Sequence, residues 1–166
     1  MSEASALSIR PARPGDADVI LDLIRALAVY EKMEDQVVAT PERLQATLFG
    51  DRPEAHCLLA EVGGEAVGLA IYFYSYSTFL ARKGLHLEDL YVKEAFRGRG
   101  YGEAILRFLA GIALKASCGR FEWTVLDWNE PAICFYKKMG ADILDEWRIC
   151  RVAGPALKTL ARGGIE

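Results

Sequence analysis

Hydrophobic and polar residues follow two different periods along this chain. Six segments are rich in apolar or alternating residues and are predicted to be strands: 6–12, 56–62, 66–76, 85–92, 120–126 and 147–152. Four segments place apolar residues three and four positions apart and are predicted to be helices: about 16–32, 40–50, 102–116 and 129–140. The order of elements predicts one mixed α/β domain over residues 1–166, with a core from about 7 to 162.

Local signals mark the ends of several elements. Thr40 is a suitable N-cap, Pro41 suits the first turn that follows it, and Gly50 is placed to end that helix. Asn129 is a suitable N-cap for the last predicted helix, which Gly140 follows. The two glycines at 63 and 64 predict a tight turn between two strands.

The stretch FRGRGYGEAILRFLAG, residues 96–111, joins a predicted strand to a predicted helix. Its glycines expose main-chain N–H groups next to the positive end of a helix dipole, an arrangement that favours a phosphate or pyrophosphate. The stretch fits neither the P-loop pattern nor the dinucleotide pattern, because Glu103 and Ala104 stand where those motifs need other residues. A glycine-rich turn without a ligand is the structural alternative.

Composition limits the classes of function. The chain has 166 residues, of which 52% are hydrophobic and 26% charged, and its net charge is −3, so bulk attraction to nucleic acid or to an anionic membrane is not expected. The four cysteines form no C-x-x-C pair, so no metal site is predicted. The chain shows no signal peptide and no apolar run of membrane-spanning length, and we therefore expect a cytoplasmic protein.

At the glycine stretch the sequence resembles the GNAT superfamily of N-acetyltransferases. Arg97, Gly100 and Gly102 match the R/Q-x-x-G-x-G/A segment that holds the pyrophosphate of acetyl-CoA in that family. Residues 10–37, 56–62, 86–92 and 126–141 resemble the diamine acetyltransferases, which include spermidine/spermine and thialysine N-acetyltransferases. The resemblance implies a mostly antiparallel mixed sheet with helices on both faces and splayed central strands that hold acetyl-CoA.

The same resemblance assigns a set of residues to the co-substrate acetyl-CoA. The implied contacts come from the strand before the loop, the loop itself and the start of the last predicted helix. They are Leu90, Tyr91, Val92, Arg97, Gly98, Arg99, Gly100, Tyr101, Gly102, Glu103, Asn129, Glu130, Pro131 and Ala132. The role of Asn129 as a helix cap is compatible with a contact to the cofactor arm.

Acetyl transfer needs a neutral amine and a proton for the departing thiolate. Glu88 is the predicted acceptor of the amine proton, because an alkyl ammonium is mostly protonated at neutral pH. Strand alternation predicts Glu88 and Leu90 on one face and Asp89 and Tyr91 on the other. Structurally, either acid could instead pair with an arginine such as Arg10 or Arg148.

Tyr136 matches the family position that protonates the leaving sulfur. From the helix pattern alone, Tyr136 is equally a half-buried core tyrosine with a satisfied hydroxyl. Tyr30 and Glu31 match positions that contact the amine in the diamine acetyltransferases, so both are secondary predictions for the substrate site. The alternative for these two residues is a solvated acidic turn.

The subfamily remains open between polyamine and thialysine-like substrates. The motifs at 76–78 and 125–129 resemble the thialysine enzymes, whereas those at 129–131 and 135–141 resemble the polyamine enzymes. Phe79 stands where both groups often have tryptophan, and Arg82 or Lys83 could bind the carboxylate of an amino-acid substrate.

Two other functions are consistent with the sequence. One is a GNAT enzyme for a different acceptor, such as a protein N-terminus or an antibiotic amine, and the other is a non-catalytic module that binds acetyl-CoA. Family members are commonly homodimers, and the aromatic run at 71–79 could supply part of such an interface.

Overall fold

The computed structural model describes residues 6–163 of the chain. The chain forms two compact units, Met1–Leu126 and Asp127–Glu166. Within the described residues, no helix is both long and apolar enough to cross a bilayer.

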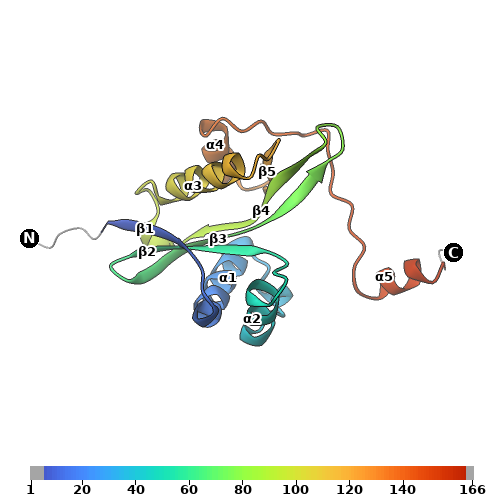
Figure 1. Ribbon diagram of the computed structural model, residues 1–166, viewed down its shortest axis with the longest axis horizontal. Helices are drawn as coiled ribbons and strands as arrows, with labels where there is room; N and C mark the ends of the chain where they lie inside the picture. The colour runs from blue at the N-terminus through green and yellow to red at the C-terminus, as the bar shows by residue number, and fades with distance from the viewer. Residues whose placement is uncertain (1–5, 164–166) are drawn as a thin grey trace, which may run out of the picture. The chain divides into compact units, whose positions relative to one another are not determined.

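The first unit is built on a five-stranded sheet whose strands follow the chain in order (Figure 1). The strands are β1 (Leu7–Pro11), β2 (His56–Val62), β3 (Glu65–Ser77), β4 (Arg82–Val92) and β5 (Phe121–Trp123). The first four strands are antiparallel neighbours, and β5 runs parallel to β4. The mixed, mostly antiparallel sheet expected from the resemblance is therefore confirmed.

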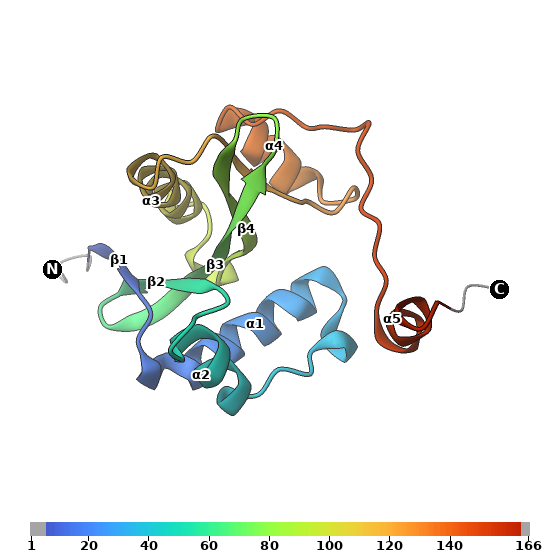
Figure 2. The ribbon, with the colours of Figure 1, turned by 45° about the vertical axis from the view of Figure 1, so that its right-hand side comes forward.

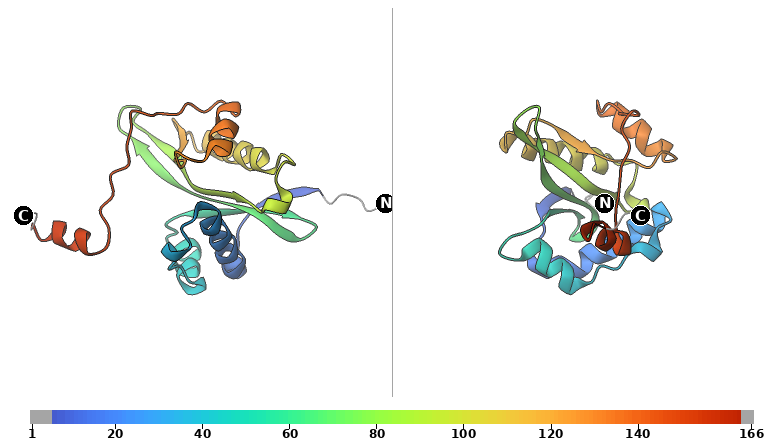
Figure 3. Two further views of the ribbon diagram at one scale, coloured as in Figure 1. Left: turned by 180° about the vertical axis from the view of Figure 1, so that it is seen from behind. Right: turned by 90° about the vertical axis from the view of Figure 1, so that its right-hand side faces the viewer.

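Helices cover both faces of this sheet, also as expected. Helices α1 (Ala17–Glu31) and α2 (Pro41–Phe49) lie on one face, and α3 (Tyr101–Lys115) lies on the other (Figures 1 and 3). On the first face, Ile20 and Leu23 of α1 pack in one cluster with Leu59 and Leu69 of the sheet. Each fully buried side chain of this size contributes about 1.5–3 kcal/mol to the free energy of unfolding, so this interface fixes α1 on the sheet.

The predicted end signals of these elements are confirmed. The Oγ1 of Thr40 accepts a hydrogen bond of 3.3 Å from the N–H of Arg43, Pro41 opens α2, and Gly50 ends it. Gly63 and Gly64 form a two-residue turn with φ of 60° and 84° between β2 and β3. Two positive φ values in a two-residue loop are typical of a type I′ hairpin, which suits the twist of the strands.

The hairpin of β3 and β4 is longer than the rest of the sheet (Figure 2). Strand β2 pairs with β3 only as far as Tyr72, whereas β3 and β4 remain paired to Ser77 and Arg82. At its tip Phe79 is fully exposed, so this position does not contribute to the core.

The second unit contains α4 (Glu130–Lys138) and α5 (Gly154–Ala161). The Oδ1 of Asn129 accepts a 3.3 Å hydrogen bond from the N–H of Ala132, which confirms the predicted cap, and Gly140 follows α4 with a φ of 88°. The prediction of a strand over 147–152 is wrong in this structure, because those residues form no strand. A strand needs a second strand to pair with, and the described residues of this unit contain none.

Candidate active site

The central strands separate beside the glycine stretch. Strand β5 pairs with β4 only at Leu85↔Phe121, His86↔Glu122 and Leu87↔Trp123, whereas β4 continues to Val92 (Figure 1). The second half of β4 therefore has an open side where β5 has already ended. This is the splayed pair of strands that the resemblance implies.

A β-bulge at Glu88 marks the point where the two strands separate. Asp89 pairs with Ile71 and Leu87 pairs with Tyr72, so Glu88 is skipped in the ladder between β3 and β4. The predicted alternation is wrong at this residue. The extra residue in a bulge places two successive side chains, here those of Glu88 and Asp89, on similar sides of the strand. The Oε2 of Glu88 lies 3.9 Å from the Nε2 of His86, two residues before it.

The bulge also decides which main-chain groups of β4 face the opening. The N–H of Lys93 donates a 2.8 Å hydrogen bond to the carbonyl of Val67 on β3. In an antiparallel pair, residues alternate between facing the partner strand and facing away from it, so Leu90 and Val92 turn their main-chain groups away from β3. Tyr91 turns its main chain toward β3 and its ring into the core, where it is buried.

Three carboxylates from two distant segments interact beside the bulge. Burial is the main cause that raises the pKa of Asp89 to about 6, and the negative charges of Glu88 and Glu31 raise it further. Burial also raises the pKa of Glu31, the last residue of α1. We call Glu31, Glu88 and Asp89 the acidic cluster. It contains two of the predicted residues together with Asp89, which our sequence analysis did not assign to the site, although an acid in an otherwise apolar strand was the signal.

The glycine loop has the backbone that its composition suggests. Gly98 and Gly100 have φ values of 73° and 80°, in a region that other residues rarely adopt, and an added Cβ at either position would meet open space. Gly100 is the N-cap of α3 and supplies no side-chain cap. The first N–H groups of α3, from Tyr101, Gly102 and Glu103, have no acceptor one turn earlier in the helix and form a potential anion site.

The two arginines of the loop lie against their own surroundings. The Nε of Arg97 donates to the carbonyl of Val92 at 2.9 Å, and its guanidinium carbon lies 4.6 Å from the ring centre of Tyr30 and 5.5 Å from that of Tyr91. Arg99 donates to the carbonyl of Ala95 at 3.2 Å. Tyr30, predicted for the amine site, therefore touches a residue predicted for the cofactor site.

The other predicted residues belong to the second unit. Asn129 is buried and caps α4, which begins with Glu130, Pro131 and Ala132. Tyr136 lies in the middle of α4, and its ring centre is 5.4 Å from that of Phe135.

The structural alternative for the acids of β4 is not supported for Arg10. Its guanidinium binds Asp16 and Glu61, each at 2.7 Å, rather than Glu88 or Asp89. These hydrogen bonds lower the pKa of Asp16 and raise the pKa of Arg10. Arg10 thus ties β1 to the start of α1 and to β2.

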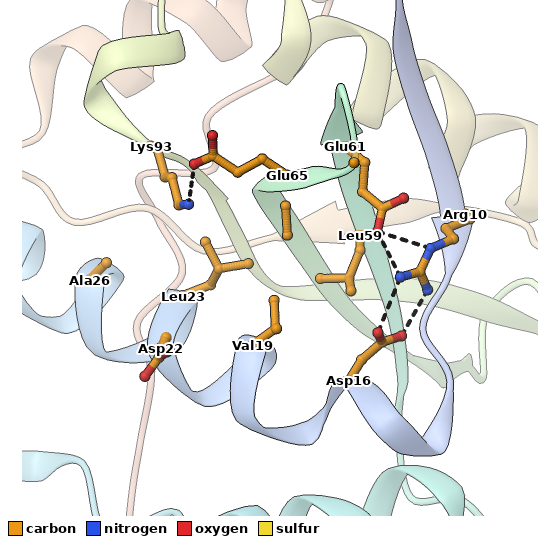
Figure 4. Close-up of a pocket in the computed structure, with 12 residues that line it drawn as sticks. Arg10, Asp16, Val19, Asp22, Leu23, Ala26, Leu59, Glu61, Glu65 and Lys93 are labelled. Carbon is orange, nitrogen blue, oxygen red and sulfur yellow. Dashed lines mark hydrogen bonds and ion pairs between the residues drawn. The ribbon is translucent and has the colours of Figure 1, made fainter.

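The same network lines a cavity of about 430 Å³ between α1 and the β2–β3 hairpin (Figure 4). Lys93 and Glu65, which also line it, form an ion pair of 2.8 Å. Apolar residues such as Val19, Leu23 and Leu59 complete its wall. None of the residues predicted for cofactor or amine lines this cavity, and most of its charged side chains are paired with one another.

Among residues 6–163, no group of three or more His, Cys, Asp or Glu side chains is arranged to hold a metal ion. All four cysteines, Cys57, Cys118, Cys134 and Cys150, carry free thiols. Burial raises the pKa of the Cys57 thiol to about 12, so it is a core residue rather than a nucleophile.

Comparisons with known proteins agree with this geometry. Residues 20–141 match the model of the acetyltransferase (GNAT) family. The chain is 43% identical to thialysine N-epsilon-acetyltransferase of Sus scrofa, over 92% of this chain and 96% of that protein. It is 37% identical to spermidine/spermine N(1)-acetyltransferase-like protein 1 of Homo sapiens, over 86% of this chain and 22% of that protein.

A solved structure resembles the chain over nearly its full length. An integron cassette protein from the mobile metagenome of V. cholerae has a TM-score of 0.78 and 25% identity, and the match covers 94% of this chain and 98% of that one. The split between β4 and β5, the glycine loop at the start of α3 and these similarities have one explanation: the chain belongs to the GNAT family and is an N-acetyltransferase.

Proposed function

We propose that this enzyme transfers the acetyl group of acetyl-CoA to the primary amine of a small cationic molecule, either a diamine or polyamine or a thialysine-like amino acid. The observation that carries the proposal is the acidic cluster, which lies where β4 loses its partner strand. A buried carboxylate with two like charges beside it is costly for the fold, and an ammonium group would relieve that cost.

Acetyl-CoA occupies the opening beside β4 in this proposal. The N–H groups at the start of α3 bind the pyrophosphate, and the main-chain groups of Leu90 and Val92 bind the pantetheine arm and polarise the thioester carbonyl. The exposed main chain at Gly98 and Gly100 supports this assignment. Asn129 and the first turn of α4 are assigned to the cofactor arm from the resemblance.

The chemistry is a direct attack by the amine. Glu88 accepts a proton from the ammonium, directly or through water, and the neutral nitrogen then attacks the thioester carbonyl carbon. The C–N bond forms, the C–S bond breaks, and the sulfur takes a proton from Tyr136 as coenzyme A leaves. The nitrogen loses its second proton as the amide forms, and this proton returns through solvent to Tyr136. Asp89 and Glu31 attract the cationic substrate and orient it, because their charges lie beside that of Glu88.

Two classes of amine fit the acidic cluster, polyamines and amino acids with an amine in the side chain. The higher identity to a thialysine enzyme supports an amino acid with an amine in its side chain. Arg82 and Lys83 begin β4, about 17–20 Å along the strand before Glu88, so they do not belong to the acidic cluster. Lys83 instead lies 4.9 Å from the ring centre of Tyr74.

The direct test is release of free thiol from acetyl-CoA by the purified protein. Thialysine, lysine, ornithine, putrescine, spermidine, spermine and a peptide amine would be compared at one concentration. We expect turnover of one or more of the small cationic amines and none of the peptide. Turnover of the peptide alone would replace the small-molecule substrate, and binding of acetyl-CoA without turnover of any amine would favour the non-catalytic module.

We also propose that the chain is a single acetyltransferase domain that works as a homodimer in the cytoplasm. Four free thiols support a reducing compartment. The second unit exposes large apolar residues that a partner copy could cover, namely Leu144, Trp147, Ile149, Val152, Leu157 and Leu160. Light scattering of the purified protein at micromolar concentration tests the dimer, and a mass of about 18 kDa would contradict it.

A further inference from the structure

The guanidinium of Arg97 is held on one side by aromatic rings. Its central carbon lies 4.6 Å from the ring centre of Tyr30 and 5.5 Å from that of Tyr91, and its Nε donates to the carbonyl of Val92 at 2.9 Å. Both ring distances are within the range of a cation–π interaction. All four residues belong to the first unit.

We propose that Tyr30 is a positioning residue that holds Arg97 and thereby couples the glycine loop to the end of α1, so that acetyl-CoA and the amine bind cooperatively. This inference rests on the proposed function, because the loop is assigned to acetyl-CoA there. It adds a role for the aromatic face of Tyr30 that is distinct from any contact of its hydroxyl with the amine.

The rings of Tyr91 and Tyr30 differ in how deeply they are buried. Tyr91 is buried and belongs to the core cluster on the α1 face of the sheet, so its ring is fixed by packing. Tyr30 is 36% exposed and lies in the last turn of α1. It is the more exposed of the two rings, so its substitution tests the contact with Arg97 while disturbing the core less than a change at Tyr91.

Tyr30 also stands next to the acidic cluster in the chain. Its neighbour Glu31 ends α1, and the charge of Glu31 acts on Asp89 of β4. A shift of the last turn of α1 would therefore move a cluster carboxylate and the ring against Arg97 together. Ordering of the loop by acetyl-CoA fixes Arg97, and this restrains the same turn that presents Glu31.

The ring of Tyr30 can be tested separately from its hydroxyl. Tyr30→Leu removes the aromatic face, whereas Tyr30→Phe keeps it. An exposed cation–π contact corresponds to about a two- to fivefold change in an equilibrium constant, so we expect Tyr30→Leu to raise the KM for acetyl-CoA by about that factor. Tyr30→Phe should leave this KM at the wild-type value, whatever it does to the KM of the amine.

Tyr74→Leu is a matched control. Tyr74 is 39% exposed and has a cation–π contact with Lys83 at 4.9 Å, on the β3–β4 hairpin. The Tyr74→Leu substitution removes a cation–π interaction that lies away from the glycine loop, so we expect no change in the KM for acetyl-CoA. Thermal unfolding of each variant shows whether the fold is retained.

A double-mutant cycle tests the pair itself. In an Arg97→Met background, Tyr30→Leu should have no further effect on the KM for acetyl-CoA, because the charge that the ring holds is gone. Effects that simply add would show that Tyr30 acts without Arg97 and would overturn the inference.

Cooperativity is the readout that a purely structural role would not move. The dissociation constant of coenzyme A would be measured by calorimetry with and without saturating thialysine, or the best amine of the panel. We expect thialysine to tighten coenzyme A binding in the wild type and Tyr30→Phe, and the effect to shrink toward none in Tyr30→Leu. A wild-type protein that binds no acetyl-CoA would defeat the proposed function. Equal cooperativity in the wild type and Tyr30→Leu would overturn only this inference.

Discussion

The Nε2 of His86 lies 3.9 Å from the Oε2 of Glu88, two residues further along β4. Glu88 is the extra residue of a bulge, so it has no partner in the ladder with β3, and the bulge lies next to the point where β5 ends. The side chain of Glu88 is 58% exposed there, which is consistent with our proposal that it contacts the amine.

Replacing Glu88 by Gln removes the proton acceptor and keeps the size of the side chain. Loss of a general base typically lowers turnover by about 10²–10⁴-fold, so we expect kcat to fall within that range. The loss should shrink at high pH, where more of the free amine is already neutral. A pH–rate profile of the variant that coincides with the wild type would remove Glu88 from the mechanism.

Asp89→Asn should stabilise the fold while impairing the amine site. The folded-state pKa of about 6 is above the ordinary value of 3.8, so this group lowers the free energy of unfolding at neutral pH, and that loss disappears as the pH falls from 6 toward 4. We expect Asn to raise the free energy of unfolding at pH 7.5 by up to about 3 kcal/mol. Urea unfolding at pH 7.5 and pH 4 measures this, and the gain should be absent at pH 4.

The same shift predicts how the affinity for the amine depends on pH. Below about pH 6 the wild-type Asp89 becomes protonated, so the KM of a cationic amine should rise as the pH falls through that value. In Asp89→Asn the KM should already be high and should no longer change near pH 6. A wild-type KM that stays constant from pH 7.5 to 5 would contradict the assignment of Asp89.

Gly100→Ala tests the cofactor loop. The φ of 80° costs an L-residue about 1–2 kcal/mol, and the new methyl group would point into the open space where we place a phosphate. We expect weaker acetyl-CoA binding and a lower melting temperature. Gly111→Ala inside α3 is the control, since its Cβ also meets open space and should stabilise the helix by about 0.5–1 kcal/mol. Unchanged acetyl-CoA binding by Gly100→Ala would argue against this loop as the phosphate site.

Tyr136→Phe separates cofactor binding from proton transfer. The substitution removes only the hydroxyl, so coenzyme A affinity should remain near the wild-type value while kcat falls by about 10²-fold or more. With an acetyl-CoA analogue whose leaving thiol is more acidic, turnover should depend less on Tyr136. Turnover equal to the wild type would reduce Tyr136 to a core residue of its unit.

Asp16→Asn should weaken the fold without affecting catalysis. Asp16 accepts hydrogen bonds from both terminal nitrogens of Arg10 and from the N–H of Arg13, and we expect a loss of about 1–3 kcal/mol in the free energy of unfolding at pH 7. Because the pKa of Asp16 is lowered in the fold, this stabilisation is present above the ordinary value of 3.8 and is lost as the pH falls below it. Chemical unfolding should therefore show a smaller difference between the variant and the wild type at pH 3 than at pH 7.

Several elements followed from local sequence signals. Helix α2 begins after Thr40, with Pro41, and ends at Gly50, as predicted. Helix α4 likewise begins after Asn129 and is followed by Gly140. Such ends are predictable because caps and positive φ values depend on a few adjacent residues. The glycine loop was also recognisable, since its spacing matches a family motif. The predicted strand over 147–152 failed for the opposite reason: alternation gives a segment a strand-like surface, but pairing requires a second strand that local sequence does not supply.

The sequence by itself determined the class of fold, the glycine-rich loop before α3 and the presence of acids in an apolar strand. Only the tertiary structure decided that Glu88 is a bulge, that the charge of Glu31 acts on Asp89, and that Arg97 lies against Tyr30. The bulge depends on the register of β3 against β4, and the other two relationships depend on the packing of α1 near β4 and the glycine loop. Strand periodicity is a local property, whereas register, burial and charge coupling are set by the neighbours that folding brings together.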